Sequence, residues 1–492
     1  MALDAIIAGG QRIEGHRPFP CVVIDAQAWQ DAAGLLAAGE LTLLSVWGET
    51  GRVHMAVLQS AAPAIVVLSL ECPDNTYPSV GRVHAPAIRL ERVMRDLIGL
   101  NPVGALDMRP WFDHGRWGDE SPPPYDFLPV EGENLHRIPV GPVHAGIIEP
   151  GHFRFTCDGE TVVRLEQRLG YVHKGIDALL HGASIPRALR LAGRTSGDST
   201  VAYAYAFCLA VEAALGIAVP PRAAALRGVM AELERIANHL GDFGAICNDA
   251  AFSIMLAHCG VLRERVLRCA SACFGHRLMM DRIVPGGVSS DLNADGAAAI
   301  GALVTEVRAR LAPLVALYDG TASLQDRTVG TGILRPDLAL RFGAGGYVGR
   351  ASGRDFDARR AVGYAPYDRL TFDVPVRRDG DVNARIWIRI HEIEQSLVLL
   401  EHLLKTLPKG EVRASVEDAP LEPGEGMALV EAFRGDVLVW LRVAGGRVDR
   451  CHLRDASWFQ WPLLEVAIEG NIVADFPLCN KSFNCSYSGH DL

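Results

Sequence analysis

Two short polar clusters contain the residue types that could support chemistry. Residues 194–200 (RTSGDST) stand directly before the most apolar stretch of the chain, and residues 486–491 (SYSGHD) lie near its carboxyl-terminal end. Hydroxyl and carboxyl groups at a helix start can accept hydrogen bonds from unpaired backbone N–H groups. The first cluster therefore fits either a helix cap or a polar site on the end of a buried helix. The second follows an apolar, strand-like run at residues 471–479, so we expect it to be anchored inside the protein.

Other motifs point away from several kinds of chemistry. The eleven cysteines form no C-x-x-C pair, and Cys269 and Cys273, four residues apart on a predicted helix, are typical of two buried small side chains. Residues 343–349 (GAGGYVG) have the wrong spacing for a dinucleotide-binding loop, and neither G-x-x-x-x-G-K-[ST] nor H-E-x-x-H occurs. A hydrolase built on Ser196 and His490 would lack the usual nucleophile elbow.

The first part of the chain predicts a small α+β domain, which we place at residues 1–118. Residues 41–47 and 53–59 flank Glu49-Thr50-Gly51 and predict a hairpin. Residues 88–100 place Leu90, Val93, Leu97 and Leu100 on one helical face. Further predicted elements are strands at residues 21–24 and 63–70 and a helix at residues 27–38.

The remainder predicts a mainly helical domain with small sheets. Three prolines within residues 111–125 indicate an extended linker, which we place at residues 119–135 before a second domain at 136–492. Turns at Asp158-Gly159 and at Gly445-Gly446 predict two hairpins, and residues 227–240 and 384–407 carry helical apolar stripes. The fold class is therefore α+β.

Composition narrows the functional class. The chain has 492 residues, 49% of them hydrophobic, a net charge of −10 and no basic stripe, so we expect no nucleic-acid partner. Mean hydropathy is +0.14, which indicates apolar surfaces covered by other subunits. Residues 201–220 approach the length of a membrane span, but Glu212 and two closing prolines favour a buried core helix. We expect no secretory signal and therefore reduced cysteines.

Longer blocks of sequence carry a resemblance to a known family. Residues 141–180, which end in GYVHKGIDALL, together with 230–249 (MAELERIANHLGDFGAICND) and 384–396 (ARIWIRIHEIEQS), resemble the large subunit of group 4 membrane-bound NiFe hydrogenases, including formate hydrogenlyase, and the 49 kDa-type quinone-site subunit of respiratory complex I. Residues 90–118 resemble the 30 kDa-type subunit of complex I, so the chain looks like a fusion of the two.

The chain departs from that family at its metal ligands. The family holds nickel and iron with cysteines in an R-x-C-G-x-C block and in a C-Y-S-C-T-D block. The matching positions here are Ser196, Ser199, Ser486 and Gly489, while Cys485 stands one residue out of register. Serine hydroxyls are hard, protonated donors, whereas nickel in such a site needs thiolates. We therefore expect no metal and a nickel-free relative of the hydrogenases.

The resemblance implies a subunit that is inactive alone. It would bind no cofactor itself and would pack against a small subunit with a 4Fe–4S cluster, a ferredoxin-like subunit and membrane-embedded proton- or ion-translocating subunits. Its place would be peripheral, on the cytoplasmic side of the inner (plasma) membrane. It would either pass electrons to a quinone-like acceptor, in the manner of the NADH dehydrogenase family, or couple the redox state of the cluster to ion movement. A catalytically degenerate scaffold is the alternative.

The site residues implied by the resemblance fall into two groups. The quinone-binding tyrosine of complex I falls at Gly197 here, and Arg194 matches an arginine beside the terminal cluster. The former metal cavity, a candidate quinone site, would be lined by Arg194, Ser196, Ser199, Ser486 and His490. Candidates for proton handling are His144, Glu149, His152, Asp177 and Asp198. For His144 and His152, structural hydrogen bonds in their loop are the alternative. We also predict that the side chain of Ser196 or Ser199 lies within about 8 Å of Ser486 or Gly489, because the family's matching ligands all reach the same metal.

Overall fold

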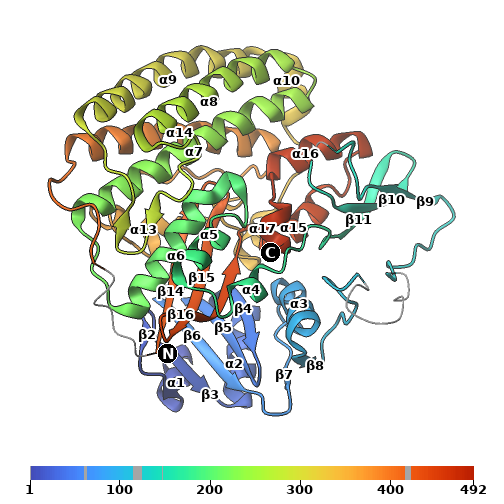
Figure 1. The fold of residues 1–492 in the computed structure, drawn as a ribbon. Coiled ribbons are helices and arrows are strands. Elements are labelled where there is room, and N and C mark those ends of the chain that lie inside the picture. Colours follow the sequence, from blue (N-terminus) through green and yellow to red (C-terminus); the bar gives the residue numbers. More distant parts are fainter. Residues whose placement is uncertain (1, 60–63, 115–124, 147, 416–422) are drawn as a thin grey trace.

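A computed structural model describes residues 2–59, 64–114, 125–146, 148–415 and 423–492. The fold is α+β, as the sequence predicted. An amino-terminal sheet with its helices lies at one end of the molecule, and a larger helical body with small sheets lies against it (Figure 1). The three-stranded sheet of β9, β10 and β11 extends to one side of this body.

The amino-terminal domain is built on a five-stranded sheet in the order β1-β3-β6-β5-β4. The predicted hairpin is confirmed, because β4 and β5 pair antiparallel from Leu41↔Gln59 to Glu49↔Arg52. The strands are β1 (Gln11–Arg12), β3 (Cys21–Ile24), β4 (Leu41–Glu49), β5 (Arg52–Gln59) and β6 (Ala64–Glu71), with α1 (Ala2–Gly9), α2 (Ala26–Ala38), α3 (Ile88–Ile98) and the parallel pair β7 (Thr76–Pro78) and β8 (Asn101–Val103) around them.

Two further sheets belong to the larger domain. The strands β9 (Leu135–Val140), β10 (His152–Asp158) and β11 (Thr161–Arg168) form the first, and β14 (Gly424–Ala432), β15 (Gly435–Ala444) and β16 (Arg447–Arg454) form most of the second. Both hairpins predicted in this domain are confirmed. The short pair β12 (Ile283–Val284) and β13 (Gly287–Val288) stands apart.

Helices make up the rest of the larger domain. The long ones are α6 (Thr200–Leu215), α7 (Pro221–Asp249), α8 (Ser253–Phe274), α9 (Ala294–Gly320) and α14 (Val382–Lys405). The shorter ones are α4 (Ile176–Leu180), α5 (Ile185–Ala192), α10 (Ala322–Thr328), α11 (Pro336–Arg341), α12 (Gly346–Ala351), α13 (Ala358–Ala361), α15 (Ser457–Ala467), α16 (Phe476–Phe483) and α17 (Tyr487–Asp491).

The apolar stretch before Pro220 is the buried helix α6, as predicted. Its residues from Thr200 to Cys208 are all shielded from solvent, and it packs across β14 and β15. Two glycines of β14 permit this close approach, since a Cβ on Gly426 would lie 1.8 Å from the carbonyl oxygen of Ala210. Among the helices of the described residues, none combines the length and the apolar character that a membrane crossing requires.

Buried charges fix how the central helices pack. The guanidinium of Arg350 in α12 donates to Glu392 of α14 at 2.8 Å and to Glu431 of β14 at 2.8 Å. The other oxygen of Glu392 meets His239 of α7 at 2.8 Å, and Arg359 of α13 binds Glu232 of α7 at 3.0 Å. Removing one member would leave an uncompensated buried charge, so the network holds these elements in a single arrangement.

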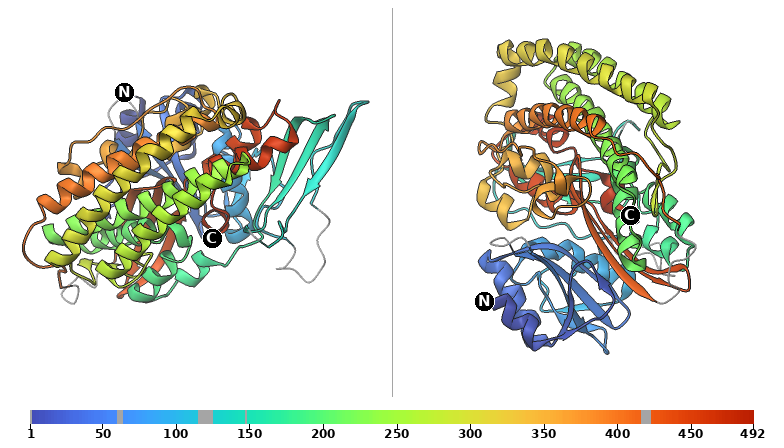
Figure 2. Two further views of the ribbon diagram at one scale, coloured as in Figure 1. Left: turned by 90° about the horizontal axis from the view of Figure 1, so that it is seen from above. Right: turned by 90° about the vertical axis from the view of Figure 1, so that its left-hand side faces the viewer.

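The two domains are joined by a common sheet and by ion pairs. The strand β2 (His16–Arg17) joins the edge of β14 in parallel, so a segment of the amino-terminal part completes the four-stranded sheet β16-β15-β14-β2. Arg442 of β15 binds both carboxylate oxygens of Glu49 at 2.8 and 2.9 Å. Figure 2 shows the amino-terminal sheet against this second sheet, with the helical layer on the far side.

Several predicted elements require correction. Residues 471–479 form no strand, since helix α16 begins at Phe476 with Pro477 in its first turn, where proline is favoured. Trp111 and Phe112, before the predicted linker, are buried. Residues 115–124 lie outside the described residues, and 125–134 contain neither helix nor strand. Cys269 and Cys273 lie on α8 and are only partly buried.

We predict that Gly426→Ala destabilises the protein by about 3 kcal/mol or more, because the new methyl group overlaps the backbone of α6. Gly260→Ala is the matched control. Gly260 lies on α8 with nothing within 4 Å of a built Cβ, so alanine there should stabilise the helix by about 0.5–1 kcal/mol. Urea unfolding of the full chain measures both. Equal stability of the two variants would contradict the close packing of α6 on β14.

Candidate functional site

The two polar clusters meet, although 290 residues separate them. The hydroxyl oxygens of Ser196 and Ser486 are 2.9 Å apart, and both residues are buried. The prediction that these serines lie within about 8 Å of each other is therefore confirmed. The short helix α17 brings Ser486 to this point, and the turn before α6 brings Ser196.

The hydrogen bonds of the serine pair run in one direction. The amide of Gly489 donates to the Ser486 hydroxyl at 2.9 Å, and the Ser196 hydroxyl donates its single proton to Asp198 Oδ1 at 2.8 Å. The Ser486 hydroxyl must therefore be the donor to Ser196. The chain of donors ends on the Asp198 carboxylate, which is its final acceptor.

An arginine that the sequence reasoning missed holds this carboxylate in place. Arg434, in the tight connection between β14 and β15, donates to both oxygens of Asp198 at 2.7 and 2.5 Å. Desolvation would raise the pKa of Asp198, but the charge and hydrogen bonds of Arg434 outweigh it and lower that pKa to about 2. Arg434 also donates to the backbone oxygen of Asn484, two residues before Ser486. The pair thus joins both polar clusters to the sheet.

The start of α6 is not capped by the hydroxyls that precede it. The side chain of Ser199 makes no capping bond, and Glu234 of α7 instead accepts the backbone N–H groups of Val201 and Ala202 at 2.7 and 3.1 Å. Burial raises the pKa of Glu234 to about 8, although the two backbone hydrogen bonds that it accepts act to lower it. The helix-cap interpretation of residues 194–200 is therefore wrong, and the cap comes from the next helix, α7.

Two of the expected cavity residues point elsewhere. Arg194 is exposed and forms a bidentate ion pair with Asp281 at 2.8 and 2.7 Å, so it neither pairs with Asp198 nor lines the serine pair. The ring of His490 is buried, and its Nδ1 lies 2.8 Å from Asp491 Oδ1 in a hydrogen bond. The ring also stacks on Trp458, with the two ring centroids 4.1 Å apart. Desolvation lowers the pKa of His490 despite the neighbouring Asp491, which favours a neutral ring.

The loop histidines make structural contacts. His144 Nε2 bonds the carbonyl of Gly151 at 2.8 Å, and His152 Nδ1 bonds the carbonyl of Gly141 at 3.2 Å, so each ring ties one side of the loop to the other. This agrees with the structural alternative for both residues. Glu149 is exposed and accepts the backbone N–H of Ser488 at 3.2 Å. Asp177 lies at a separate pocket between the domains.

The donor set does not fit a nickel centre. The four positions offer three hydroxyls and a glycine, and the hydroxyls of Ser196 and Ser486 are already bonded to each other. At Gly489 a Cβ would lie 2.7 Å from Asp455 Oδ2, so the Asp455 carboxylate stands where a side chain at 489 would begin. Tyr203 of α6 donates to that same oxygen at 2.8 Å. Among the described residues, no group of three or more His, Cys, Asp or Glu is arranged to hold a metal ion.

Comparison of the chain with known proteins identifies its relatives. Residues 249–421 match the family model described as the 49 kDa subunit of respiratory-chain NADH dehydrogenase. The chain is 32% identical over 353 residues to the carbon monoxide-induced hydrogenase of Rhodospirillum rubrum, covering 71% of this chain and 98% of that protein. It is 31% identical over 525 residues to formate hydrogenlyase subunit 5 of Escherichia coli (strain K12), covering 97% and 92%.

The fused arrangement and the fold also have counterparts. The C/D subunit of the NADH-quinone oxidoreductase of Phocaeicola vulgatus is 29% identical over 440 residues, covering 82% of this chain and 84% of that protein. A solved chain of the membrane-bound sulfane sulfur reductase, an archaeal respiratory membrane complex, superposes with a TM-score of 0.69 at 25% identity, covering 73% of this chain and 99% of that one.

Replacing Ser486 by alanine should destabilise the protein by about 1–3 kcal/mol, because the buried Gly489 N–H loses its acceptor and the Ser196 oxygen loses a donor. Ser488→Ala on the same short helix is the control. The Ser488 side chain takes no part in these bonds, so its loss should change stability by no more than about 0.5 kcal/mol. Thermal or urea unfolding measures both variants. Equal effects would mean that the serine pair contributes nothing specific.

Proposed function

The chain belongs to the family of complex I 49 kDa-type and membrane-bound hydrogenase large subunits, and from that membership we propose that it is the core large subunit of a membrane-associated oxidoreductase that works without a NiFe centre. The relatives are named as subunits of hydrogenases, of formate hydrogenlyase and of NADH-quinone oxidoreductase, and the matching structure is titled a respiratory membrane complex.

One observation carries the nickel-free part of this proposal. The hydrogen-bonded serine pair and the Asp198–Arg434 ion pair satisfy one another without any metal, and Asp455 stands beside the position that would have to supply a fourth ligand. Thiolates bind nickel because they are soft and deprotonated, whereas serine hydroxyls at neutral pH are neither.

The partners follow from the family. We propose that the chain contacts a small subunit with a 4Fe–4S cluster and reaches membrane-embedded proton- or ion-translocating subunits directly or through a ferredoxin-like subunit, on the cytoplasmic side of the membrane. Mean hydropathy of +0.14 supports extensive cover by other subunits. Electron transfer itself would then occur in the neighbouring subunit.

Between the two roles open to the serine pair, its packing favours conformational coupling over acceptor binding. The pocket between α7 and α8 that touches Asp198 has a volume of about 10 Å³, too small for a quinone head group, and neither Ser196 nor Ser486 lines it. The site also joins three separate parts of the chain, namely the start of α6, the β14–β15 connection and the carboxyl-terminal helix α17. On this proposal, a change of charge on a neighbouring cluster acts on the charged members of the site, Asp198 and Arg434.

The nickel-free assignment predicts that the purified chain, produced in nickel-supplemented cells, contains far less than one nickel per chain. Inductively coupled plasma mass spectrometry of the desalted protein measures this, and a family member that retains all four cysteines serves as the positive control. About one tightly held nickel per chain would overturn the assignment.

The coupling role predicts a redox-dependent change in the exchange of backbone amides. In the intact complex, hydrogen–deuterium exchange at residues 194–215 and 486–492 should differ between the dithionite-reduced and the ferricyanide-oxidised states. The helix α9 (Ala294–Gly320) is the internal control and should exchange equally in both states. Asp198→Asn should abolish the difference, because it removes the charge that binds Arg434. Identical exchange in both states would instead support a degenerate scaffold.

A further inference from the structure

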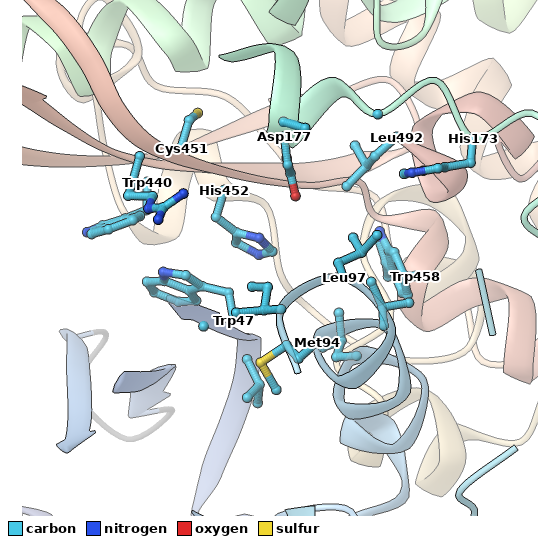
Figure 3. A pocket seen from close by; sticks show the side chains of 18 residues that line it. Trp47, Met94, Leu97, His173, Asp177, Trp440, Cys451, His452, Trp458 and Leu492 are labelled. Carbon is cyan, nitrogen blue, oxygen red and sulfur yellow. The ribbon is translucent and has the colours of Figure 1, made fainter. Parts of the chain in front are cut away.

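A pocket between the two domains is separate from the serine pair. Its volume is about 230 Å³, and it lies between β4 and α3 of the amino-terminal domain and β16 and α4 of the larger domain. Figure 3 shows the carboxyl of Asp177 pointing into it, with Trp47 and His452 on one side and Leu97 and Trp458 on the other. The amino-terminal domain therefore supplies one wall of the pocket.

The walls are apolar and aromatic. Trp47 and His452 stack with ring centroids 5.1 Å apart and planes within 6°, and Trp440 lies 5.6 Å from Trp47. The helix α3 contributes an aliphatic side made of Leu90, Val93, Met94, Leu97 and Ile98. A cavity of about 150 Å³ with such walls is large enough to hold benzene, so this one has room for a benzene ring with a short substituent.

Polar groups at this pocket lack partners. Asp177 is the single side-chain carboxylate among the lining residues, its Oδ1 is shielded from water, and that oxygen has no hydrogen-bond partner within the part of the chain that the structure describes. The indole N–H groups of Trp47, Trp440 and Trp458 are likewise buried without a partner there. Unsatisfied buried polar atoms are uncommon in native proteins. Because the Asp177 carboxyl points into the pocket, a ligand there can supply its missing partner.

We propose that this pocket binds a small uncharged aromatic carbonyl compound, which packs against the tryptophans and accepts a hydrogen bond from the Asp177 carboxyl. A protonated Asp177 carboxyl that points into the pocket can donate one hydrogen bond to an acceptor oxygen on the ligand. The flat aromatic walls favour a ring. A cationic ligand fits less well, because Arg450 is one of the lining residues.

The protonation state of Asp177 agrees with this geometry. Desolvation raises the pKa of Asp177 to about 7, so the acid is a hydrogen-bond donor below neutral pH. The titratable groups that line the pocket with it are Arg450, Cys451 and His452 of β16 and His173 of the preceding loop, whereas α3 and β4 offer apolar lining residues. Burial lowers the pKa of His452 to about 3, which leaves that ring neutral.

Binding is tested with acetophenone as the probe and ethylbenzene, which lacks the carbonyl, as its matched analogue. Saturation-transfer NMR on the full chain should show saturable binding of acetophenone at pH 6, about 3- to 10-fold tighter than that of ethylbenzene, the range expected for one net hydrogen bond. At pH 8.5 the ionised carboxylate can no longer donate, so the advantage of acetophenone should disappear.

Three variants of the full chain assign the effect to this pocket. Asp177→Asn keeps an N–H donor and should bind acetophenone equally at both pH values. Asp177→Leu should bind acetophenone no better than ethylbenzene, and Leu97→Trp should bind neither because the new ring fills the cavity.

Several outcomes would overturn the proposal. They are no saturable binding, equal affinity of the two probes for the unmodified chain, tighter binding of phenyltrimethylammonium than of acetophenone, or a pH dependence that persists in Asp177→Asn and so belongs to another group such as His173. Because none of these measurements involves nickel or redox state, the proposed function and this inference can fail separately.

Discussion

The ion pair between Asp198 and Arg434 is the interaction on which the arrangement around the serine pair depends. It connects the turn before α6 to the β14–β15 connection, and Arg434 also binds the backbone of Asn484, just before α17. A buried arginine without its carboxylate would be strongly destabilising. The pair therefore requires three segments that are far apart in sequence to meet at one point, and the serine hydroxyls complete the hydrogen bonds around it.

The same principle holds through the helical body. Glu234 caps α6 from the middle of α7, and Arg350 binds acids of α14 and β14. Hydrophobic packing alone would allow helices to slide or rotate slightly, whereas paired buried charges accept one geometry. The close contact of α6 with Gly424 and Gly426 adds a steric limit of the same kind. Paired charges and glycines thus constrain the positions of the elements that form the site, in addition to the apolar core.

The sequence predicted elements from local signals and missed partners that have none. Hairpins at Asp158-Gly159 and at Gly445-Gly446 and the helical stripe of α14 were recognisable, because turn chemistry and periodicity lie within a few residues. The prediction that the two serine clusters meet came from the family resemblance. Arg434 and Glu234 could not be predicted, since their partners are 236 and 33 residues away and no local pattern marks either. The resemblance placed Arg194 at the cavity, and no local pattern marks the ion pair that it forms with Asp281, 87 residues away.

The hydrogen bonding at the four positions that match the family's thiolates supports the proposed nickel-free assignment. Deleting four metal ligands from a buried site would leave a cavity and unsatisfied groups, each of which costs free energy. Here the hydroxyls bond one another, Asp455 fills the space beside Gly489, and Tyr203 donates to Asp455. The hydroxyls, Asp455 and Tyr203 thus satisfy one another's hydrogen bonds. On the proposed coupling role, a charge in a neighbouring subunit would act on a connected network that reaches α6, the sheet and α17 together.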